Sequence, residues 1–325
     1  MNRQEQRGMA DIRAMKRHQR VNEIVARKAK NKAKVTNNEE GLETDSLVIG
    51  VGPGVCTIAP DGGEPRLCRT EMSVAPGDRV AIRFEKVAAI APRRTTLSRT
   101  DPVNVHRERV IAANIDILVI VAAIADPPFR PGLVDRYLVA AARGGVQPIL
   151  CVTKVDLAAD TSAAEVYREA GVPVVRCSVQ VDEGTDGTGI DELRGLLAGS
   201  LAVFAGHSGV GKSSLLNALA REARARTGGV SEETGKGTHT TTSSWLYTLK
   251  NGARIIDTPG IRVFDPGTVT ADQLSAAFPE FAEYGCRFRD CKHREEPGCG
   301  IRGAVDDGSI PKGRYMSYLK IRGDF

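Results

Sequence analysis

The sequence predicts an α/β protein made of three folded parts that follow a basic N-terminal arm. Residues 44–100 hold short β-like runs separated by turn signals. Between residues 101 and 264, apolar strand-like runs alternate with helical patterns, which is typical of a mostly parallel sheet covered by helices. Residues 265–325 are polar and irregular, with helical patterns around a cluster of cysteines and a histidine. We therefore expect a small barrel, a central α/β domain and an α-helical C-terminal module.

The composition is that of a globular protein without a membrane anchor. Hydrophobic residues make up 41% of the 325 residues, and no apolar run approaches the roughly 18 residues that a membrane span needs. The N-terminus lacks the apolar stretch of a secretory signal, and the odd count of seven cysteines argues against a disulfide framework. We expect a cytoplasmic monomer that has no membrane partner.

The arm, residues 1–43, carries the basic character of the chain. Its first 34 residues hold eleven Lys and Arg against three acidic residues, whereas the whole chain has a net charge of +5. The rest of the chain is therefore net acidic. Because the arm lacks hydrophobic periodicity, we expect it to be flexible and to contact nucleic-acid phosphates without sequence preference. A merely solvated tail is the alternative.

The region 44–100 is predicted to close into a barrel of the OB type. Gly, Pro and Asp residues separate its strand-like runs. The expected strands are Leu47–Gly50, Gly54–Ile58, Pro65–Thr70, Arg79–Phe84 and Val87–Ile90. This pattern alone does not distinguish an OB-fold from an SH3-like barrel.

The central domain is predicted from apolar runs that alternate with amphipathic segments. The expected strands are Ile115–Ala123, Val146–Val152, Val172–Ser178, Leu201–Gly206, Trp245–Leu249 and Arg254–Asp257. The expected helices are Pro131–Arg143, Gly189–Leu197 and Gly211–Arg224, followed in the C-terminal module by Thr270–Phe281 and Tyr315–Ile321. Asn251-Gly252 marks a hairpin between the last two strands.

A phosphate-binding loop is predicted between the strand Leu201–Gly206 and the helix after it. The loop fits the pattern G-x-x-x-x-G-K-[ST] in the strand-to-helix context that confirms it. Its glycines let backbone N–H groups wrap nucleotide phosphates at the positive end of the helix. We expect Lys212 to reach the β/γ oxygens and the Ser213 hydroxyl to bind Mg²⁺. The expected nucleotide-binding residues here are Gly206, His207, Ser208, Gly209, Val210, Gly211, Lys212, Ser213 and Ser214.

Guanine is the predicted base. The run Thr153, Lys154, Val155, Asp156 follows the strand Val146–Val152 and fits the guanine motif N/T-K-x-D, with Thr in place of the commoner Asn. A carboxylate at Asp156 can accept the N1–H and N2–H of guanine, which adenine does not offer. The Lys154 stem would cover the base. Ser178, at the end of the next strand, is a looser candidate for a backbone contact with guanine O6, and an ordinary strand end is the alternative.

Two more segments are expected to respond to the γ-phosphate. The run from Asp257 to Gly260 fits D-x-x-G, so we expect Asp257 to hold the Mg²⁺ shell through water and the Gly260 N–H to sense the γ-phosphate. The threonine-rich run 238–242 lies where the first switch belongs. Thr240 and Thr241 are its candidates to close on the γ-phosphate and Mg²⁺, with Thr241 assigned to the ion.

The order of these motifs is permuted. In ordinary GTPases the phosphate loop comes first and the base motif near the end, whereas here T-K-x-D precedes the loop and D-x-x-G. Because domain termini often lie close together, such a permutation can keep the core sheet. The predicted fold is therefore a circularly permuted P-loop GTPase domain, 101–264. Its D-x-x-G segment leads directly into the C-terminal module, so we hypothesise that the γ-phosphate state can move that module.

A structural zinc site is predicted in the C-terminal module. Cys286, Cys291, His293 and Cys299 supply three thiolates and one imidazole, which is a complete tetrahedral set for one Zn²⁺. The segment is too poor in apolar residues to fold unaided, so metal binding would supply the missing free energy. Buried or idle cysteines are the alternative, and the other four cysteines of the chain are interpreted as core residues.

The permuted order, the barrel and the Cys/His module occur together in one bacterial family. Over residues 44–322 the chain resembles the ribosome small subunit-dependent GTPase A family, through the segments GHSGVGKSS, GTHTTT, DTPGIR and CRFRDCKHREEPGC. The resemblance implies GTP hydrolysis stimulated by the 30S ribosomal subunit, late in its maturation. It also implies that the barrel and zinc module bind 16S rRNA, and ribosome assembly factors are a further class of partner that it allows.

The resemblance also implies how water is oriented for the reaction. Ile261 stands where many GTPases have a water-orienting Gln, and His239 is the implied substitute. Contact with RNA or phosphate is the alternative role of His239, and ribosomal groups would then complete the site.

Three other functions fit parts of the pattern. A P-loop ATPase or kinase would lack the preference for guanine that Asp156 confers. A GTP-gated RNA scaffold would bind nucleotide without hydrolysing it. A permuted GTPase that serves the large subunit is disfavoured by the barrel before the GTPase domain and the zinc module after it.

Overall fold

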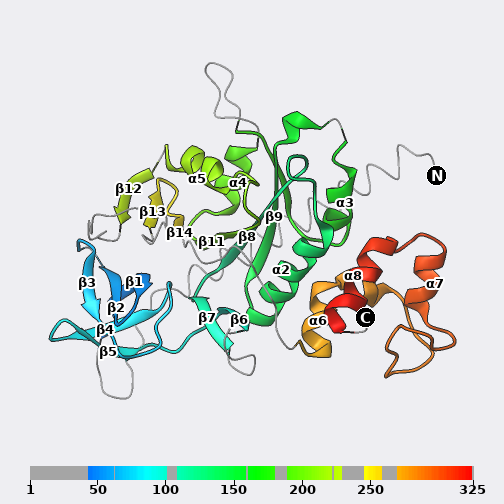
Figure 1. The fold of residues 1–325 in the computed structure, drawn as a ribbon, viewed down its shortest axis with the longest axis horizontal. Coiled ribbons are helices and arrows are strands. Elements are labelled where there is room, and N and C mark those ends of the chain that lie inside the picture. Colours follow the sequence, from blue (N-terminus) through cyan, green and yellow to red (C-terminus); the bar gives the residue numbers. More distant parts are fainter. Residues whose placement is uncertain are drawn as a thin grey trace.

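The computed structural model describes residues 43–61, 63–100, 108–158, 160–179, 189–221, 223–228, 245–257 and 269–323. The central sheet domain lies between the barrel at one end of the molecule and the C-terminal module at the other (Figure 1). In this part of the chain no helix is both long and apolar enough to span a membrane. The predicted arm lies almost entirely outside the described residues, and the predicted domain boundaries stay predictions.

The five predicted barrel strands are confirmed. They are β1 (Ser46–Gly52), β2 (Val55–Pro60), β3 (Arg66–Arg69), β4 (Arg79–Arg83) and β5 (Lys86–Ile90). They close in the order β1-β2-β3-β5-β4, with β3 parallel to β5 and the other pairs antiparallel. This closed five-stranded barrel fits the OB-type prediction. Its small core consists of Val48, Cys56, Ile58, Cys68, Val74, Val80 and Val87.

A hairpin that the sequence did not predict joins the barrel to the central domain. Its strands β6 (Thr96–Thr100) and β7 (Glu108–Ala113) form a separate two-stranded sheet. Leu97 and Ala112 are buried and join the large core beside helix α2 (Pro131–Gly144). Gly144 approaches the hairpin closely, because a Cβ there would lie 1.8 Å from the Thr96 carbonyl oxygen.

The central sheet has seven strands in the order β10-β9-β8-β11-β14-β13-β12. The first five are parallel, β13 pairs antiparallel with β14, and β12 pairs antiparallel with β13. The strands are β8 (Ile117–Ala123), β9 (Gln147–Thr153), β10 (Val174–Cys177), β11 (Leu201–Ala205), β12 (Ala223–Gly228), β13 (Trp245–Leu249) and β14 (Arg254–Asp257). Alternate residues of β8 and β11 enter two different cores, as expected for strands covered on both faces.

Helices cover both faces of this sheet. α2 and α3 (Ser162–Glu169) pack on one face, and α4 (Ile190–Leu196) and α5 (Lys212–Ala220) on the other. α3 was not predicted. The prediction that the helix after the phosphate loop continues to Arg224 is wrong, because that helix ends at Ala220 and β12 begins at Ala223.

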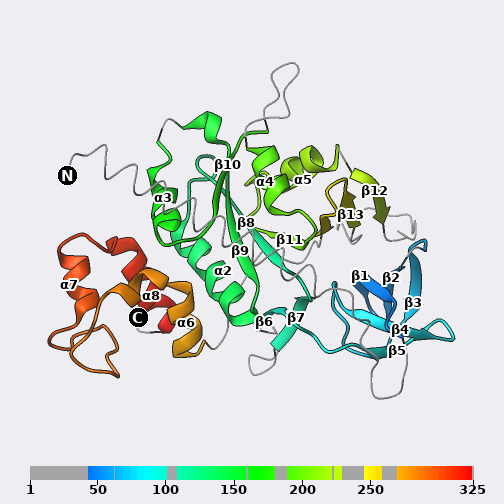
Figure 2. The same cartoon turned by 180° about the vertical axis from the view of Figure 1, so that it is seen from behind.

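The C-terminal module packs against α2 on the side of the sheet domain away from the barrel (Figures 1 and 2). Its elements are α6 (Ala271–Ala277), the 3₁₀ helix η3 (Pro279–Glu283), α7 (Gly300–Asp306) and α8 (Lys312–Arg322). α6 begins with a capping box between Thr270 and Gln273. The predicted helix Thr270–Phe281 is interrupted at Phe278 because Pro279 cannot continue the α-helical hydrogen bonds, and α7 was not predicted.

Candidate nucleotide site and metal centre

The phosphate-loop sequence lies at the switch point of the sheet. β8 and β11 are neighbours, but the chain continues from β8 to β9 on one side and from β11, through α5, toward β12–β14 on the other. In such sheets, ligands bind in the crevice outside the carboxyl ends of the strands where the order reverses. The segment Gly206–Lys212 leaves β11 at this crevice and leads into α5, so its position is that of a ligand-binding loop.

Three glycines of the loop have backbone conformations that other residues rarely adopt. Gly206 has φ +155°, Gly209 has φ +81° and Gly211 has φ +90°. A Cβ on Gly206 would lie 2.2 Å from the Val121 carbonyl oxygen, so a side chain is excluded there. The Lys212 ammonium folds back and donates to the carbonyl oxygens of Gly206 and His207, at 2.8 and 2.6 Å. Ser213 and Ser214 are exposed in the first turn of α5.

The predicted base motif is bonded directly to this loop. The Thr153 hydroxyl, at the end of β9, donates to the Val210 carbonyl oxygen at 2.6 Å. Thr in place of Asn therefore still links the two motifs, which are 57 residues apart in the sequence. Lys154 adopts a left-handed conformation with φ +58°, and its ammonium donates to the Asp126 carbonyl oxygen.

Asp156 is oriented by a residue from the next strand end. The Ser178 hydroxyl donates to the Asp156 carboxylate at 2.6 Å. Asp156 lies in the short 3₁₀ helix η2 (Val155–Leu157) that follows β9. The side chain of Ser178 makes this bond, and the expected contact of its backbone with guanine O6 stays a prediction. The structure thus brings together Thr153, Lys154, Asp156, Ser178 and the phosphate-loop segment.

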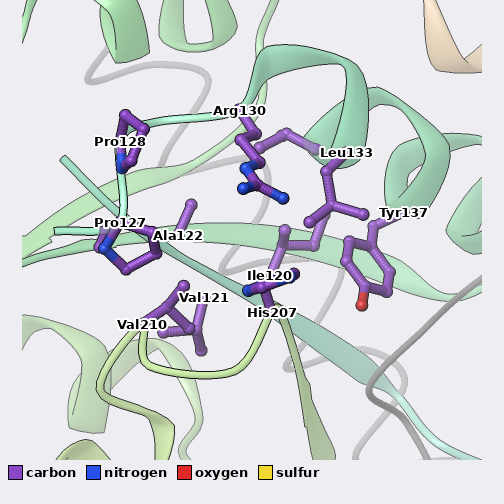
Figure 3. Close-up of a pocket in the computed structure, with 12 residues that line it drawn as sticks. Ile120, Val121, Ala122, Pro127, Pro128, Arg130, Leu133, Tyr137, His207 and Val210 are labelled. Atoms are coloured by element: carbon purple, nitrogen blue, oxygen red, sulfur yellow. The ribbon is translucent and has the colours of Figure 1, made fainter. Parts of the chain in front are cut away.

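An apolar pocket lies beside the loop (Figure 3). Pro127 and Pro128 line one side of the pocket, and Leu133 and Tyr137 of α2 line the other. The loop residues His207 and Val210 lie below them. Arg130 and strand β8 complete the lining. Burial raises the pKa of Tyr137 to about 12, opposed by a backbone hydrogen bond with Gly206. Sequence reasoning missed Arg130 and Tyr137, because neither belongs to a recognised motif.

The predicted γ-phosphate segments are only partly described. Asp257 ends β14, the strand beside β11, and is half-buried. His239, Thr240, Thr241 and Gly260 lie outside the described residues. Their roles, and the hypothesis that the D-x-x-G segment moves the C-terminal module, stay predictions.

The four predicted zinc ligands converge. The candidate ligand atoms of Cys286, Cys291, His293 and Cys299 all lie within 4.8 Å of one another. Cys286 Sγ is 3.4 Å from His293 Nδ1 and 3.8 Å from Cys299 Sγ, and Cys299 Sγ is 3.5 Å from the same nitrogen. Zn–S and Zn–N bonds of about 2.3 and 2.0 Å at tetrahedral angles give separations of about this size. The donor set therefore fits one zinc ion held through Nδ1.

The surroundings of the cluster orient its ligands. The Tyr315 hydroxyl donates to the His293 carbonyl oxygen at 2.6 Å, and the Phe281 and Tyr318 rings lie 6.4 and 5.8 Å from the imidazole. Burial acts to raise the pKa of the Cys286 thiol, but hydrogen bonds from the Ile301 and Gly300 backbone and from neighbouring cysteines bring that pKa below its usual value. The backbone around Cys286 thus favours the thiolate that a metal needs.

The permuted order, the switch-point loop and the sheet define a circularly permuted GTPase. The family model described as RsgA GTPase matches residues 90–266, and the chain belongs to this family. It is therefore a GTP-hydrolysing enzyme, as the sequence predicted.

Relatives and solved structures agree with this assignment. A Pseudomonas putida protein named small ribosomal subunit biogenesis GTPase RsgA is 40% identical, over 92% of each chain. A Chlorobaculum parvum protein of the same name is 39% identical, over 86% of this chain and 97% of its own. YjeQ from Thermotoga maritima matches with a TM-score of 0.61 and 28% identity, covering 86% of this chain and 97% of its own. YloQ, described as a circularly permuted GTPase, matches with a TM-score of 0.61 and 26% identity, covering 86% and 93%.

Proposed function

We propose that this GTPase acts in the late maturation of the small ribosomal subunit, and that the 30S particle stimulates its hydrolysis of GTP by binding through 16S rRNA. The observation that carries the proposal is the phosphate-loop segment hydrogen-bonded to the base motif, in a chain whose relatives are named for small-subunit biogenesis. The barrel and the Cys/His module at opposite ends support it, since each offers a separate surface for RNA.

The base is read by Asp156 in this proposal. Its carboxylate accepts the N1–H and N2–H of guanine, while the Ser178 hydroxyl holds one carboxylate oxygen and fixes the orientation. Lys154 covers the base face with its stem. An ATP-specific rival would leave this carboxylate without donors, and desolvating it would then oppose binding.

The phosphates are held by the loop. Backbone N–H groups of residues 206–213 surround them, and the Lys212 ammonium exchanges its loop carbonyl partners for β- and γ-phosphate oxygens. Ser213, Thr241 and Asp257 are the residues that would hold Mg²⁺, which supplies positive charge against the charge that develops on the phosphoryl group. The zinc ion would be structural, since four protein ligands leave no open position.

Slow hydrolysis by the isolated protein follows from its switch residues. Ile261 cannot orient the attacking water, so His239, or a group on the ribosome, must do so. Docking on the 30S particle would then complete the site, and the Gly260 N–H would report the γ-phosphate. This explains why the subunit, rather than nucleotide alone, would set the turnover.

The test is GTP hydrolysis by the full chain titrated with purified small subunits, large subunits and whole ribosomes. We expect the small subunit to stimulate hydrolysis at least tenfold and the large subunit to leave it unchanged. Equal stimulation by large subunits would contradict the proposal, and stimulated ATP hydrolysis would contradict the role of Asp156. The variant Asp156→Asn is the matched control, because an amide donates to the xanthine O2 and should shift the preference from GTP to xanthosine triphosphate.

The basic arm is proposed to add phosphate contacts with rRNA. Its excess of Lys and Arg would release counterions on binding, which makes the affinity salt-dependent. Deleting residues 1–43 should weaken small-subunit binding at low salt and flatten the dependence of affinity on salt. Unchanged binding at low salt would show that the arm is only solvated.

A further inference from the structure

The turn between β4 and β5 presents a nearly bare aromatic ring. Phe84 is 92% exposed, the highest value among the large hydrophobic side chains of the described residues, and the Arg83 guanidinium carbon lies 5.6 Å from its ring centroid. We propose that Phe84 is a base-stacking contact through which the barrel holds an unpaired nucleotide of its RNA. This inference rests on the proposed function, since it names the contact that the barrel would make with rRNA.

The backbone of this turn is strained at the residue that carries the ring. Phe84 and Glu85 both lie in the left-handed region, with φ +51° and +57°. Two-residue hairpin turns with positive φ at both positions strongly favour Asn-Gly, and a bulky residue there is an outlier. Such strain concentrates at binding sites. Since an exposed ring gains nothing from core packing, the strain points to a partner.

The turn is also held firmly. The Glu85 carbonyl oxygen accepts hydrogen bonds from the Arg69 backbone N–H at 3.0 Å and from the Cys68 thiol at 3.2 Å. Both donors belong to β3, which runs parallel to β5 with Arg69 opposite Lys86. The ring therefore projects from a braced platform, so little conformational entropy is lost when a ligand stacks on it.

The charges around the ring fit a nucleic acid. Arg66, Arg69 and Arg83 are exposed, and no ion pair involves them within the part of the chain that the structure describes. Lys86 pairs with Glu71 at 2.9 Å, and Glu85 is the acidic residue at the tip. Proteins that bind single-stranded RNA combine arginines that contact phosphates with an aromatic ring that stacks on a base. The barrel that carries this turn lies at the end of the molecule away from the C-terminal module, so this contact is separate from any that the module makes (Figure 2).

The test compares Phe84→Asn, Phe84→Tyr and the control Met72→Asn in the full chain. Asn tolerates the left-handed turn, so the first variant should fold at least as well as the wild type. We expect it to bind a fluorescent single-stranded RNA oligonucleotide and 30S particles about tenfold more weakly, within the range of base–aromatic stacking. The slope of affinity against salt should stay unchanged, because no phosphate contact is lost. Phe84→Tyr should restore binding. Met72, also exposed on the barrel at 40%, should be silent.

The outcomes separate this inference from the proposed function. Unchanged oligonucleotide and subunit binding by Phe84→Asn, with normal stimulation by 30S particles, would overturn the stacking contact and leave the proposed function standing. If Phe84→Asn binds the oligonucleotide more weakly while 30S particles fail to stimulate even the wild type, the result would support stacking and contradict the proposed function. Loss of binding to phosphatidylserine vesicles with unchanged RNA binding would overturn the inference in favour of a membrane surface.

Discussion

The barrel and the C-terminal module flank the same central domain but are stabilised in different ways. The barrel closes its own ring of hydrogen-bonded strands around seven buried side chains, while Leu47 and Ile49 of β1 join the large core and Ala59 of β2 packs against it. The module has no sheet in its described residues, and its aromatic residues Phe278, Phe281 and Tyr318 belong to the core that α2 builds. A closed sheet can thus carry a domain with a small core, whereas the short helices of the module share the core of α2 and surround a Cys/His cluster that could hold a metal.

In each part an arginine forms an ion pair with a buried aspartate, and the two arginines differ in burial. Arg314 of α8 donates to the buried Asp135 of α2 and to Glu280, and its guanidinium stacks over the Phe278 ring at 4.2 Å. Arg93, beyond the barrel, makes two 2.8 Å bonds to Asp78, which is 0% exposed. The side chain of Arg314 is 3% exposed and that of Arg93 is 24% exposed. The module is therefore joined to α2, the helix whose Tyr137 contacts the phosphate loop.

Removing the predicted zinc ion should change the contrast between the barrel and the module most strongly. In small zinc domains the metal contributes an apparent 10–16 kcal/mol, about the whole stability of a domain. We expect Cys299→Ser to lose the ion and to unfold the module while the barrel stays folded. Zinc content and hydrogen exchange, compared between residues 286–323 and 46–90, measure this. Cys68→Ala, which removes a barrel cysteine, should keep one zinc per chain. A folded module without zinc would show that the metal is dispensable.

Removing the buried arginine should have the next largest effect. Arg314→Leu leaves the carboxylates of Asp135 and Glu280 without their cation, which costs about 3–5 kcal/mol for a buried pair. The free energy of unfolding of the module, from urea titration, measures the loss. Lys320→Leu, on the exposed side of the same helix, should change it little. Replacing Arg314, Asp135 and Glu280 together by apolar residues should recover much of the loss, and no recovery would point to a role beyond the charges.

Replacing Arg93, the corresponding arginine at the barrel, should lower the free energy of unfolding by less. Arg93→Leu leaves Asp78 with the Ala75 N–H as a remaining donor, at 2.8 Å, and the arginine is already partly hydrated. We expect a loss of about 1–3 kcal/mol, seen as a lower urea midpoint for the barrel with normal zinc content. Arg69→Leu, exposed on β3, is the control. A loss as large as that of Arg314→Leu would remove the contrast between the two parts.

The elements that could be predicted from the sequence are those with a clear local pattern. Short continuous apolar runs rich in β-branched residues, such as Ile117–Ala123, indicate buried strands of an α/β domain, and the loop and base motifs carry their chemistry in adjacent residues. The hairpin β6–β7 was missed because the buried Leu97 is flanked by Thr, Ser and Arg in β6, and because β7 begins with Glu108 and Arg109, so that neither strand reads as an apolar run. The helix predicted to run to Arg224 extends into β12 because Ala and Arg are good helix formers, and pairing of β12 with β13 overrides that propensity.

The side-chain bonds of the site depend on tertiary placement, which no local pattern contains. The Thr153–Val210 and Ser178–Asp156 bonds join different strand ends. Similarly, Arg314 looks like an ordinary exposed residue of an 11-residue helix until α2 is placed against it. Only motifs whose ligands are close in sequence, such as Cys286 to Cys299, could be predicted as complete sites.

The smallest effect should come from the surface ion pair that joins Asp61, just after β2, to Arg79 at the start of β4. Arg79 donates to Asp61, whose side chain is 59% exposed, and this bond lowers the pKa of Asp61 from its usual 3.8. A lowered folded pKa means that the pair adds stability above pH 3.8 and that this stability is lost as the pH falls through the folded pKa. Because water screens the pair, Asp61→Asn should cost at most about 1 kcal/mol at pH 7.

The urea midpoints of wild type and Asp61→Asn should differ slightly at pH 7 and converge in acid below the folded pKa. Glu64→Gln, an exposed neighbour, is the control and should not change the midpoint at either pH. A cost that matches Arg93→Leu, or one that persists in acid, would mean that Asp61 acts through packing rather than charge. The barrel would then depend on its surface as much as the module depends on its buried arginine, and burial would no longer explain why the two parts differ.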